Sequence, residues 1–284
     1  MRRFARTLLF AWLGVLAGLS CSPRSEALVA DDVAYGPDSL QRMDLHFVEG
    51  RDASTPLVVL VHGGGWVAGD KRDADFMRRA LVAHGINVVN VNYRLGSATV
   101  HYPEMMADLG AAIDFLRAHA REWGVRSSRL VLWGGSAGAH LALLYAYAYD
   151  DDDAVSLVAT LGAPTCLDTF ASMRGARPRD VEGLLPIITG KPWCHDETRL
   201  DEAYRLASPY YAPHPVPTLL VHGGADDIVP VEQSRLLYRR LQQEGVPCRL
   251  IVLTGAGHGG ENAPAEESEA LNDTLLEWIL KYSN

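Results

Sequence analysis

The chain has 284 residues, of which 48% are hydrophobic and 21% are charged, and its formal net charge at pH 7 is −9. This balance is typical of a globular α/β protein and excludes bulk disorder. An acidic chain without a basic stripe also repels polyanions, so we expect no nucleic-acid partner.

The N-terminal segment has the composition of an export signal. Three arginines precede an apolar run from Leu8 to Leu19, which is too short to span a bilayer comfortably as a permanent helix. We therefore expect residues 1–20 to be a signal segment. The protein would then be exported from a bacterial cytoplasm, to be either periplasmic or anchored to a membrane.

Cys21 begins the next segment, after a sequence that resembles a bacterial lipoprotein cleavage box. Lipid attachment at Cys21 would tether the protein to a membrane. Ordinary cleavage nearby, for example after Ala27, is the alternative and would discard this cysteine. We expect residues 21–32 to be a polar tether that precedes a single domain at 33–284.

The pattern of the folded domain alternates between strands and helices. Residues 33–48 alternate loosely around a Gly-Pro-Asp-Ser turn and predict a short antiparallel hairpin at a sheet edge. Beyond it, short apolar runs predict strands, and segments of helical spacing between them predict helices. The alternation predicts an α/β fold with a mostly parallel sheet and helices on both faces. The expected strands are 57–62, 86–93, 129–133, 155–161, 218–222 and 248–253, and the expected helices are 70–84, 103–123, 137–149, 231–244 and 264–281.

Residues 162–213 interrupt this rhythm and predict a small cap insertion of loops and short helices. Because this stretch has no sustained apolar face of helical period, we do not expect a lid that works at a lipid surface. It contains Cys166 and Cys194, and an exported protein permits a disulfide between them. Cys248 lies in an apolar run and is expected to be a buried thiol. Three aromatic residues of the insertion are candidates to line a substrate pocket: Trp193, Tyr210 and Tyr211.

A nucleophile motif lies directly between a predicted strand and a predicted helix. The sequence Gly-Gly-Ser-Ala-Gly at 134–138 matches G-x-S-x-G in the strand–turn–helix context that gives this pattern its meaning. A nucleophile on such a sharp turn needs very small neighbours, since the backbones of the strand and the helix approach closely there. Ser136 is therefore the predicted nucleophile.

A glycine-rich loop, His-Gly-Gly-Gly-Trp at 62–66, follows the first buried strand. Consecutive glycines expose backbone N–H groups, and each such donor can stabilise the oxyanion of a tetrahedral intermediate by roughly 3 kcal/mol. The candidate donors are the amides of Gly64, Gly65 and Ala137. A flexible turn or an anion-binding loop is the alternative interpretation of the glycines alone.

A serine hydroxyl needs a base, and His258 is the best candidate among ten histidines because it directly follows the strand expected at 248–253. Three other histidines have structural interpretations. His62 would brace the glycine loop. His140 lies on the helix that begins next to Ser136, so its side chain cannot easily reach back to the serine. His222 would end a strand.

The acid of a catalytic triad should follow the nucleophile and precede the histidine in the chain. Asp226 follows the strand expected at 218–222 and is preferred, whereas Asp227 is expected to face solvent. Ser136, Asp226 and His258 would all lie at carboxyl ends of strands, where open α/β sheets place their sites.

Together these motifs resemble the α/β-hydrolase esterase/lipase family, close to its hormone-sensitive-lipase-like and feruloyl-esterase-like bacterial branches. The resemblance implies an α/β-hydrolase fold and a triad of Ser136, Asp226 and His258. It also implies an oxyanion hole formed by the amides of Gly64, Gly65 and Ala137. One departure is Ala139, where the family frequently has a second glycine. The resemblance covers about residues 40–282 and is carried by 62–66, 93–95, 134–138, 222–230 and 255–258.

The sequence thus predicts a carboxylic ester hydrolase that acts through an acyl-enzyme on small soluble esters, including acylated saccharides. No cofactor and no metal are implied, and the acidic run at 150–153 is interpreted as a solvated loop. One alternative is an amide-cleaving hydrolase, of aminopeptidase or formamidase type, on the same triad. Another is a catalytically silent hydrolase fold that acts as a binding module.

Overall fold

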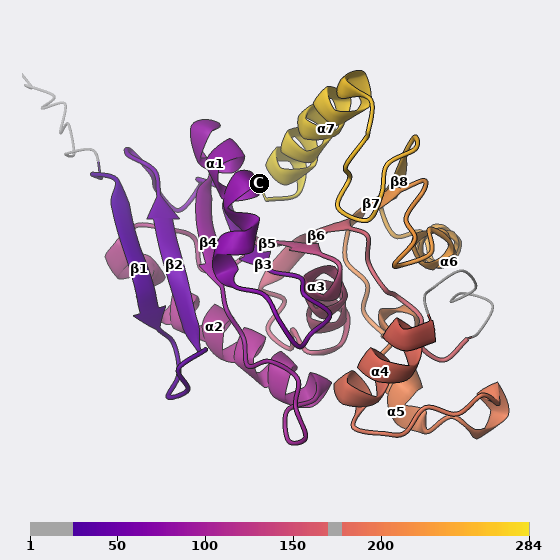
Figure 1. Cartoon of the computed structure of the whole chain (residues 1–284). Coiled ribbons are helices and arrows are strands. Elements are labelled where there is room, and N and C mark those ends of the chain that lie inside the picture. The colour runs from indigo at the N-terminus through magenta and orange to yellow at the C-terminus, as the bar shows by residue number, and fades with distance from the viewer. Residues whose placement is uncertain (1–24, 170–177, 284) are drawn as a thin grey trace, which may run out of the picture.

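The computed structural model describes residues 25–169 and 178–283 (Figure 1). The predicted signal segment and Cys21 therefore lie outside the described residues. The strands are β1 (Leu28–Ala34), β2 (Arg42–Phe47), β3 (Leu57–Val61), β4 (Asn87–Val91), β5 (Leu130–Gly135), β6 (Val155–Leu161), β7 (Thr218–Gly223) and β8 (Cys248–Leu253). The helices are α1 (Asp75–Ala83), α2 (Tyr102–Trp123), α3 (Ala137–Ala148), α4 (Pro178–Thr189), α5 (Glu202–Leu206), α6 (Glu232–Gln243) and α7 (Ala265–Ser283), with short 3-10 helices η1 (Lys71–Ala74), η2 (Glu197–Arg199) and η3 (Pro209–Tyr211).

The described strands form one sheet in the order β1-β2-β4-β3-β5-β6-β7-β8. Strand β2 pairs antiparallel with both β1 and β4, and every other pairing is parallel. The mostly parallel sheet expected from the sequence is thereby confirmed. The chain leaves β3 toward β4 and then crosses back to β5, so the strand order reverses between β3 and β5. Open α/β sheets bind ligands at the carboxyl ends of the strands at such a reversal.

The predicted edge hairpin is confirmed as β1 and β2, but it begins earlier than expected. Leu28, Ala30 and Val33 pack against the core, so residues 28–32 belong to the sheet and not to the expected tether. The two aspartates at 31 and 32 obscure the strand alternation, and the register shifts between Ala30 and Val33, where Asp32 has a φ of 55°. This β-bulge is why the strand was not recognised in the sequence.

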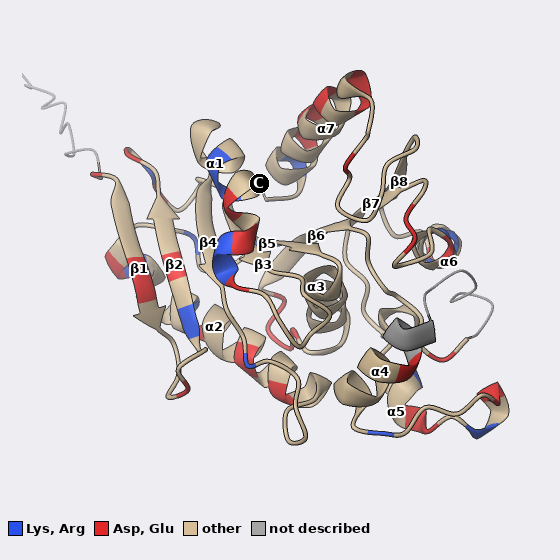
Figure 2. Ribbon diagram, viewed as in Figure 1, with Lys and Arg blue, Asp and Glu red and all other residues tan. Residues whose placement is uncertain are grey.

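Helices cover both faces of the sheet. Side chains such as Val59 and Val61 face α2, α3 and α6, whereas Val58 and Leu60 face α1 and α7. Figure 1 shows α1 and α7 on one side of the sheet and α2 and α3 on the other. Strands β3 to β7 contain no charged residue, and the charges lie mainly on the helices, on the loops and toward the sheet edges (Figure 2). Such strands, buried on both faces, are the rule in parallel sheets.

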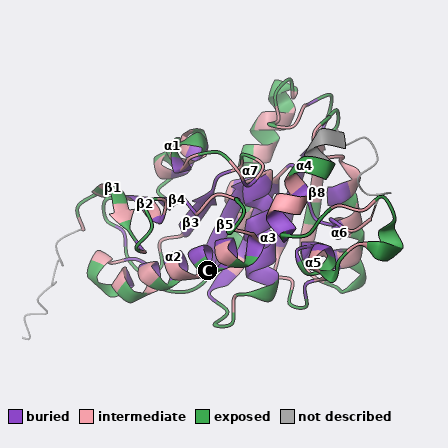
Figure 3. Ribbon diagram, turned by 60° about the horizontal axis from the view of Figure 1, so that its bottom comes forward, coloured by how far each residue is buried: buried purple, intermediate pink, exposed green. Residues whose placement is uncertain are grey.

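The centre of the molecule is helix α3, whose residues 137–147 are all buried (Figure 3). A helix that is apolar all round must be enclosed on every side. It packs on β5 and β6, and the side chains of α2 and α6 belong to the same apolar cluster. Its first residue, Ala137, directly follows Ser136, so this rigid element fixes the position of the predicted nucleophile.

The cap insertion lies between β6 and β7 and carries α4, η2, α5 and η3. Contrary to expectation, α4 has an apolar face, and Leu185 and Ile188 on this face are buried in the core. Leu184 reaches the glycine loop, where a Cβ added at Gly65 would lie 3.0 Å from its Cδ1 atom. The apolar face therefore packs inward and links the cap to the predicted oxyanion loop.

The start of the insertion is anchored by the buried side chain of Gln233 on α6. Its amide oxygen accepts hydrogen bonds from the backbone N–H groups of Thr165 and Cys166, each at 2.7 Å, and its amide nitrogen donates to the Cys166 carbonyl at 2.9 Å. Buried polar groups need such partners. Gln233 thus holds the chain where it leaves β6 for the cap.

No helix within the described ranges is both long and apolar enough to cross a bilayer. Within residues 25–169 and 178–283, no cluster of three or more His, Cys, Asp or Glu side chains is arranged to hold a metal ion.

Candidate active site

Ser136 occupies a sharp turn between β5 and α3. Its φ of 53° and ψ of −121° lie in a region that is strained for a residue other than glycine. The glycines of the motif make this turn feasible. A Cβ added at Gly134 would lie 2.4 Å from the carbonyl carbon of Gly138, and one added at Gly138 would lie 2.1 Å from the carbonyl oxygen of Val61. The backbones of β3, β5 and α3 therefore touch around the serine.

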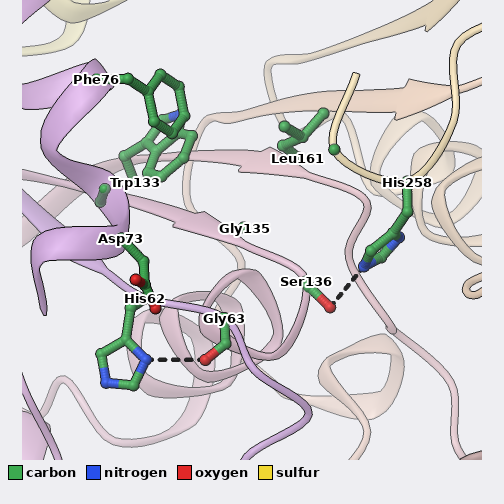
Figure 4. A pocket seen from close by; sticks show the side chains of 11 residues that line it. His62, Gly63, Asp73, Phe76, Trp133, Gly135, Ser136, Leu161 and His258 are labelled. Carbon is green, nitrogen blue, oxygen red and sulfur yellow. Dashed lines mark hydrogen bonds between the residues drawn. The ribbon is translucent and has the colours of Figure 1, made fainter. Parts of the chain in front are cut away.

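Ser136, His258 and Asp226 are joined by two hydrogen bonds. His258 Nε2 lies 2.7 Å from Ser136 Oγ, and His258 Nδ1 lies 2.7 Å from Asp226 Oδ2. Figure 4 shows the first of these contacts at the edge of a pocket. Because an ionised carboxylate can only accept, Nδ1 carries the proton and Nε2 is left to accept the hydroxyl proton of the serine. The structure thus brings together the three residues that the sequence singled out, from the loops after β5, β7 and β8.

Asp226 is held as an anion. Its side chain is fully buried, and Oδ1 accepts hydrogen bonds from the amides of Ile228 and Val229, each at 2.9 Å. Burial raises the pKa of the Asp226 carboxyl, but hydrogen bonds from His222 and His258 outweigh it and hold that pKa well below its usual range. Asp227 is exposed, as expected.

The rings of His62 and His222 are engaged away from the serine. His62 Nδ1 lies 2.8 Å from the carbonyl oxygen of Gly63, which agrees with a bracing role in the glycine loop. His222 Nδ1 accepts from the Ser234 hydroxyl at 2.7 Å, and its Nε2 donates to the Val229 carbonyl at 2.8 Å. Both histidines thus fill the structural roles that their positions suggested.

His140 has a role that the sequence did not reveal. Its Nδ1 accepts a hydrogen bond from the indole of Trp66 at 3.1 Å, and its Nε2 donates to the Ala207 carbonyl at 2.7 Å. Burial lowers the pKa of His140 to about 4, so the ring is neutral. One side chain on α3 therefore connects the glycine loop, through Trp66, with the cap, through Ala207.

The glycine loop has an unusual backbone. Gly64, Gly65 and Trp66 have φ values of 102°, 58° and 65°. A Cβ added at Gly64 would lie 2.1 Å from the Ala68 carbonyl oxygen. The loop passes close to the nucleophile, since a Cβ added at Gly63 would lie 3.4 Å from Ser136 Cβ. Glycine adopts such conformations most readily, which explains Gly64 and Gly65. Gly63 is explained by close approach instead, since a Cβ there would lie 3.0 Å from the Gly135 carbonyl oxygen.

Ala137 is the first residue of α3. Amides of the first helical turn have no acceptor within their own helix, and the helix dipole makes this end positive. Its N–H is therefore suited to bind a negative oxygen next to Ser136.

A pocket of about 200 Å³ opens beside Ser136 (Figure 4). The three aromatic residues suggested from the sequence are not part of this lining. Trp193 packs against Tyr204 with ring centroids 5.6 Å apart, and Tyr210 packs against Tyr211 at 4.9 Å. The aromatic walls come instead from α1 and β5. The pocket is lined by His62, Gly63, Asp73, Ala74, Phe76, Trp133, Gly135, Ser136, Leu161, His258 and Gly259.

The structure corrects the predicted disulfide between Cys166 and Cys194, because both residues are thiols. The Cys166 sulfur is buried and donates a hydrogen bond to Asp168 Oδ1 at 3.2 Å, and burial raises the pKa of this thiol to about 11. Gln233 fixes the backbone of Cys166 at the base of the cap, whereas Cys194 lies half-buried in the loop after α4. Cys248, expected to be buried, is half-buried on the edge strand β8.

The sequence matches the BD-FAE family over residues 43–241, well over half of the chain. The chain belongs to the BD-FAE family. One relative is Esterase LipC of Mycobacterium tuberculosis, which is 28% identical over 80% of this chain and 59% of that protein. Another is isoprenylcysteine alpha-carbonyl methylesterase ICME of Arabidopsis thaliana, which is 25% identical over 81% of this chain and 56% of that protein. The chain therefore spans about six-tenths of the length of these curated relatives.

Solved structures of esterases share the fold of this chain. The native esterase Est2 of Thermogutta terrifontis is 26% identical, with a TM-score of 0.65 over 89% of this chain and 92% of that one. A truncated carbohydrate esterase from gut microbiota is 21% identical and has a TM-score of 0.71, over 90% of this chain and 97% of that one. The second likeness shows the fold alone. The α/β-hydrolase fold expected for this BD-FAE family member is thus confirmed.

Proposed function

We propose that the protein is a serine carboxylic ester hydrolase with Ser136 as its nucleophile, His258 as its base and Asp226 as the partner of that base. The observation that carries this proposal is the hydrogen-bonded series from Ser136 Oγ through His258 to Asp226 Oδ2, with 2.7 Å at each contact. Nucleophile, base and orienting group in direct contact are the signature of an activated serine. The esterase names of the relatives support the same activity.

The first step forms the acyl-enzyme. Ser136 Oγ attacks the ester carbonyl carbon while His258 Nε2 takes its proton, and buried Asp226 stabilises the resulting imidazolium. The carbonyl oxygen becomes an oxyanion, which the amides of Gly64, Gly65 and Ala137 are proposed to bind. The intermediate then expels the alcohol, whose oxygen receives the proton from His258.

The second step reverses these roles with water. A water molecule takes the place of the alcohol beside His258, which removes one of its protons as the oxygen attacks the acyl carbon. Collapse of the second tetrahedral intermediate breaks the bond to Ser136 Oγ, and His258 returns the proton to the serine. The products are the alcohol and the carboxylic acid, and the enzyme is regenerated.

The proposed substrates are small soluble esters, including acylated saccharides. The apolar residues Leu185 and Ile188 of the cap helix are buried in the core and are not offered to a lipid surface. Among the proteins of similar fold is a carbohydrate esterase. The basic and apolar segment at 1–20 and Cys21 support export with a lipid anchor, which would bring the enzyme to envelope or extracellular esters.

Paired ester and amide substrates test this proposal. The value of kcat/KM is measured for 4-nitrophenyl acetate and for 4-nitroacetanilide with the wild type, Ser136→Ala and a control, Ser156→Ala. Ser156 lies on β6, and its hydroxyl donates to the Leu130 carbonyl at 3.5 Å, away from the site. We expect the ester to be the better substrate and only Ser136→Ala to lose turnover. Faster cleavage of the anilide would replace the ester assignment with an amide-cleaving one.

A further inference from the structure

The pocket beside Ser136 adjoins a second cavity of about 160 Å³ that lies between α1 and α7. Four residues line both spaces: Phe76, Trp133, Leu161 and Gly259. The second cavity extends along the sheet face that α1 and α7 cover. Its floor and far wall are formed by Ala159, Leu219, Val221, Leu253, Leu271 and Leu275.

The chemistry of this second cavity suits a hydrocarbon. Side chains from β6, β7, β8 and α7 make its walls mostly aliphatic. Its polar lining residues are Ser268 and Asn272 of α7 and Thr160 of β6, whose hydroxyl lies 3.5 Å from the Leu219 carbonyl oxygen. A saccharide placed inside would leave hydroxyl groups without partners, which costs free energy. An alkyl chain would instead lose contact with water at no such cost.

Phe76 marks the entrance. It is one of the few large apolar side chains that are exposed, with 54% of its surface accessible, and its ring packs edge-on against Trp133 at 5.9 Å. Figure 4 shows these two rings together on the α1 side of the pocket, across from Ser136 and His258. An exposed aromatic ring beside a nucleophile offers apolar area that a bound substrate can cover.

The order of the chemical steps decides which part of the ester would enter. The alcohol departs after the first step, and water must then take its place beside His258. The acyl group stays bonded to Ser136 through both steps, so an adjoining apolar cavity suits the group that remains. On the basis of the proposed function, we propose that the hydrocarbon of the acyl group runs from Ser136 past Phe76, Trp133 and Leu161 into the cavity between α1 and α7.

Helix α7 allows the second cavity to be filled from its polar side. Half-buried Ser268 and exposed Asn272 are one helical turn apart and line the cavity. Glu269 and Asp273 are also exposed but lie outside its lining. The test compares Ser268→Phe and Asn272→Phe with the matched controls Glu269→Phe and Asp273→Phe. For each protein, kcat/KM is measured with 4-nitrophenyl acetate, butyrate, hexanoate and octanoate.

In the wild type we expect kcat/KM to rise by up to roughly fourfold for each methylene that becomes buried. The ratio of hexanoate to acetate should fall at least about tenfold in Ser268→Phe and Asn272→Phe, because the added ring occupies the space for the chain. Both controls should keep the wild-type ratio. A second series of acetate esters with methyl to hexyl alcohols should respond equally in all five proteins.

Two results would overturn the inference while leaving the proposed function intact. One is hydrolysis of all esters with the same acyl-length profile in the cavity variants and the controls. The other is a change confined to the alkyl acetate series, which would place the alcohol in the cavity. Failure of the wild type to hydrolyse any ester would instead overturn the proposed function, and this inference with it.

Discussion

His222 Nε2 lies 3.2 Å from Asp226 Oδ2, the same oxygen that accepts the hydrogen bond from His258 at 2.7 Å. The His222 N–H, which donates to the Val229 carbonyl, thus also lies near the oxygen that binds His258, while two backbone amides bind the other carboxylate oxygen. Such a carboxylate is fixed in orientation and charge. It can hold the His258 ring with Nδ1 protonated and Nε2 facing Ser136.

Replacement of this carboxylate by an amide should disable the base. In Asp226→Asn the neutral side chain neither enforces the required tautomer of His258 nor stabilises its charged form, so kcat for 4-nitrophenyl acetate should fall roughly 10⁴-fold. The neighbouring Asp227→Asn is the matched control, because Asp227 is exposed, and it should retain wild-type turnover. Equal losses of turnover in the two variants would show that Asp226 is not the partner of His258.

The neutral state of His140 predicts a pH dependence of folding. Burial lowers the pKa of His140 from 6.5 to about 4, so the unfolded chain binds this proton more readily than the folded one. The contribution of neutral His140 to the free energy of unfolding is therefore complete above pH 6.5. It is lost as the pH falls toward 4, by at most about 1.4 kcal/mol per pH unit.

The measurement is the free energy of unfolding by urea between pH 7 and pH 4.5. In His140→Gln the free energy of unfolding should change less steeply with pH, by the equivalent of about one bound proton, since the amide does not titrate. Burial also lowers the pKa of His62, but His62 is present in both proteins and cancels in the comparison. Exposed His84→Gln should keep the wild-type slope. An unchanged slope in His140→Gln would mean that this ring does not stay neutral.

The glycines on either side of Ser136, in the turn between β5 and α3, should tolerate no side chain. In Gly138→Ala the new Cβ would lie 2.1 Å from the Val61 carbonyl oxygen, so the backbone must shift. We expect a loss of roughly 1–3 kcal/mol in the free energy of unfolding, together with a drop in turnover because Ser136 moves. Gly183→Ala on α4 is the control, since its Cβ would meet nothing within 4 Å and alanine favours a helix. Similar stability and turnover of the two variants would contradict the close backbone contact at Gly138.

The cysteines should differ in reactivity. The raised pKa and burial of Cys166 predict that iodoacetamide at pH 8 leaves it unmodified in the folded protein, whereas half-buried Cys194 is alkylated. Both should react after unfolding in urea without a reductant. Mass spectrometry of peptides from a non-reducing digest checks this, and a linked Cys166–Cys194 peptide would restore the disulfide that the structure corrects.

Features coded by local pattern could be predicted from the sequence. The ranges 155–161 and 248–253 coincide with β6 and β8, and the residues that meet at Ser136 were identified because their motifs directly follow strands. The carboxyl ends of parallel strands share one edge, so the motifs had to meet there.

Features that depend on neighbours in space could not be predicted. Trp133 has the pattern of a buried strand residue and Phe76 that of a helix residue, and only the packing of α1 beside β5 makes them walls of a pocket. The apolar face of α4 is interrupted in sequence by Pro186, which favours a loop assignment. The spacing of Cys166 and Cys194 gives no direction for either side chain.

The central claim is that Ser136 forms the covalent intermediate, and the most direct measurement is mass spectrometry of the protein treated with a fluorophosphonate. We expect one adduct per chain, located on Ser136 by peptide mapping, and none in Ser136→Ala. The same variant should lose ester turnover by roughly 10⁴- to 10⁶-fold while it unfolds cooperatively like the wild type. An adduct on another residue, or ester hydrolysis by folded Ser136→Ala near the wild-type rate, would contradict the account.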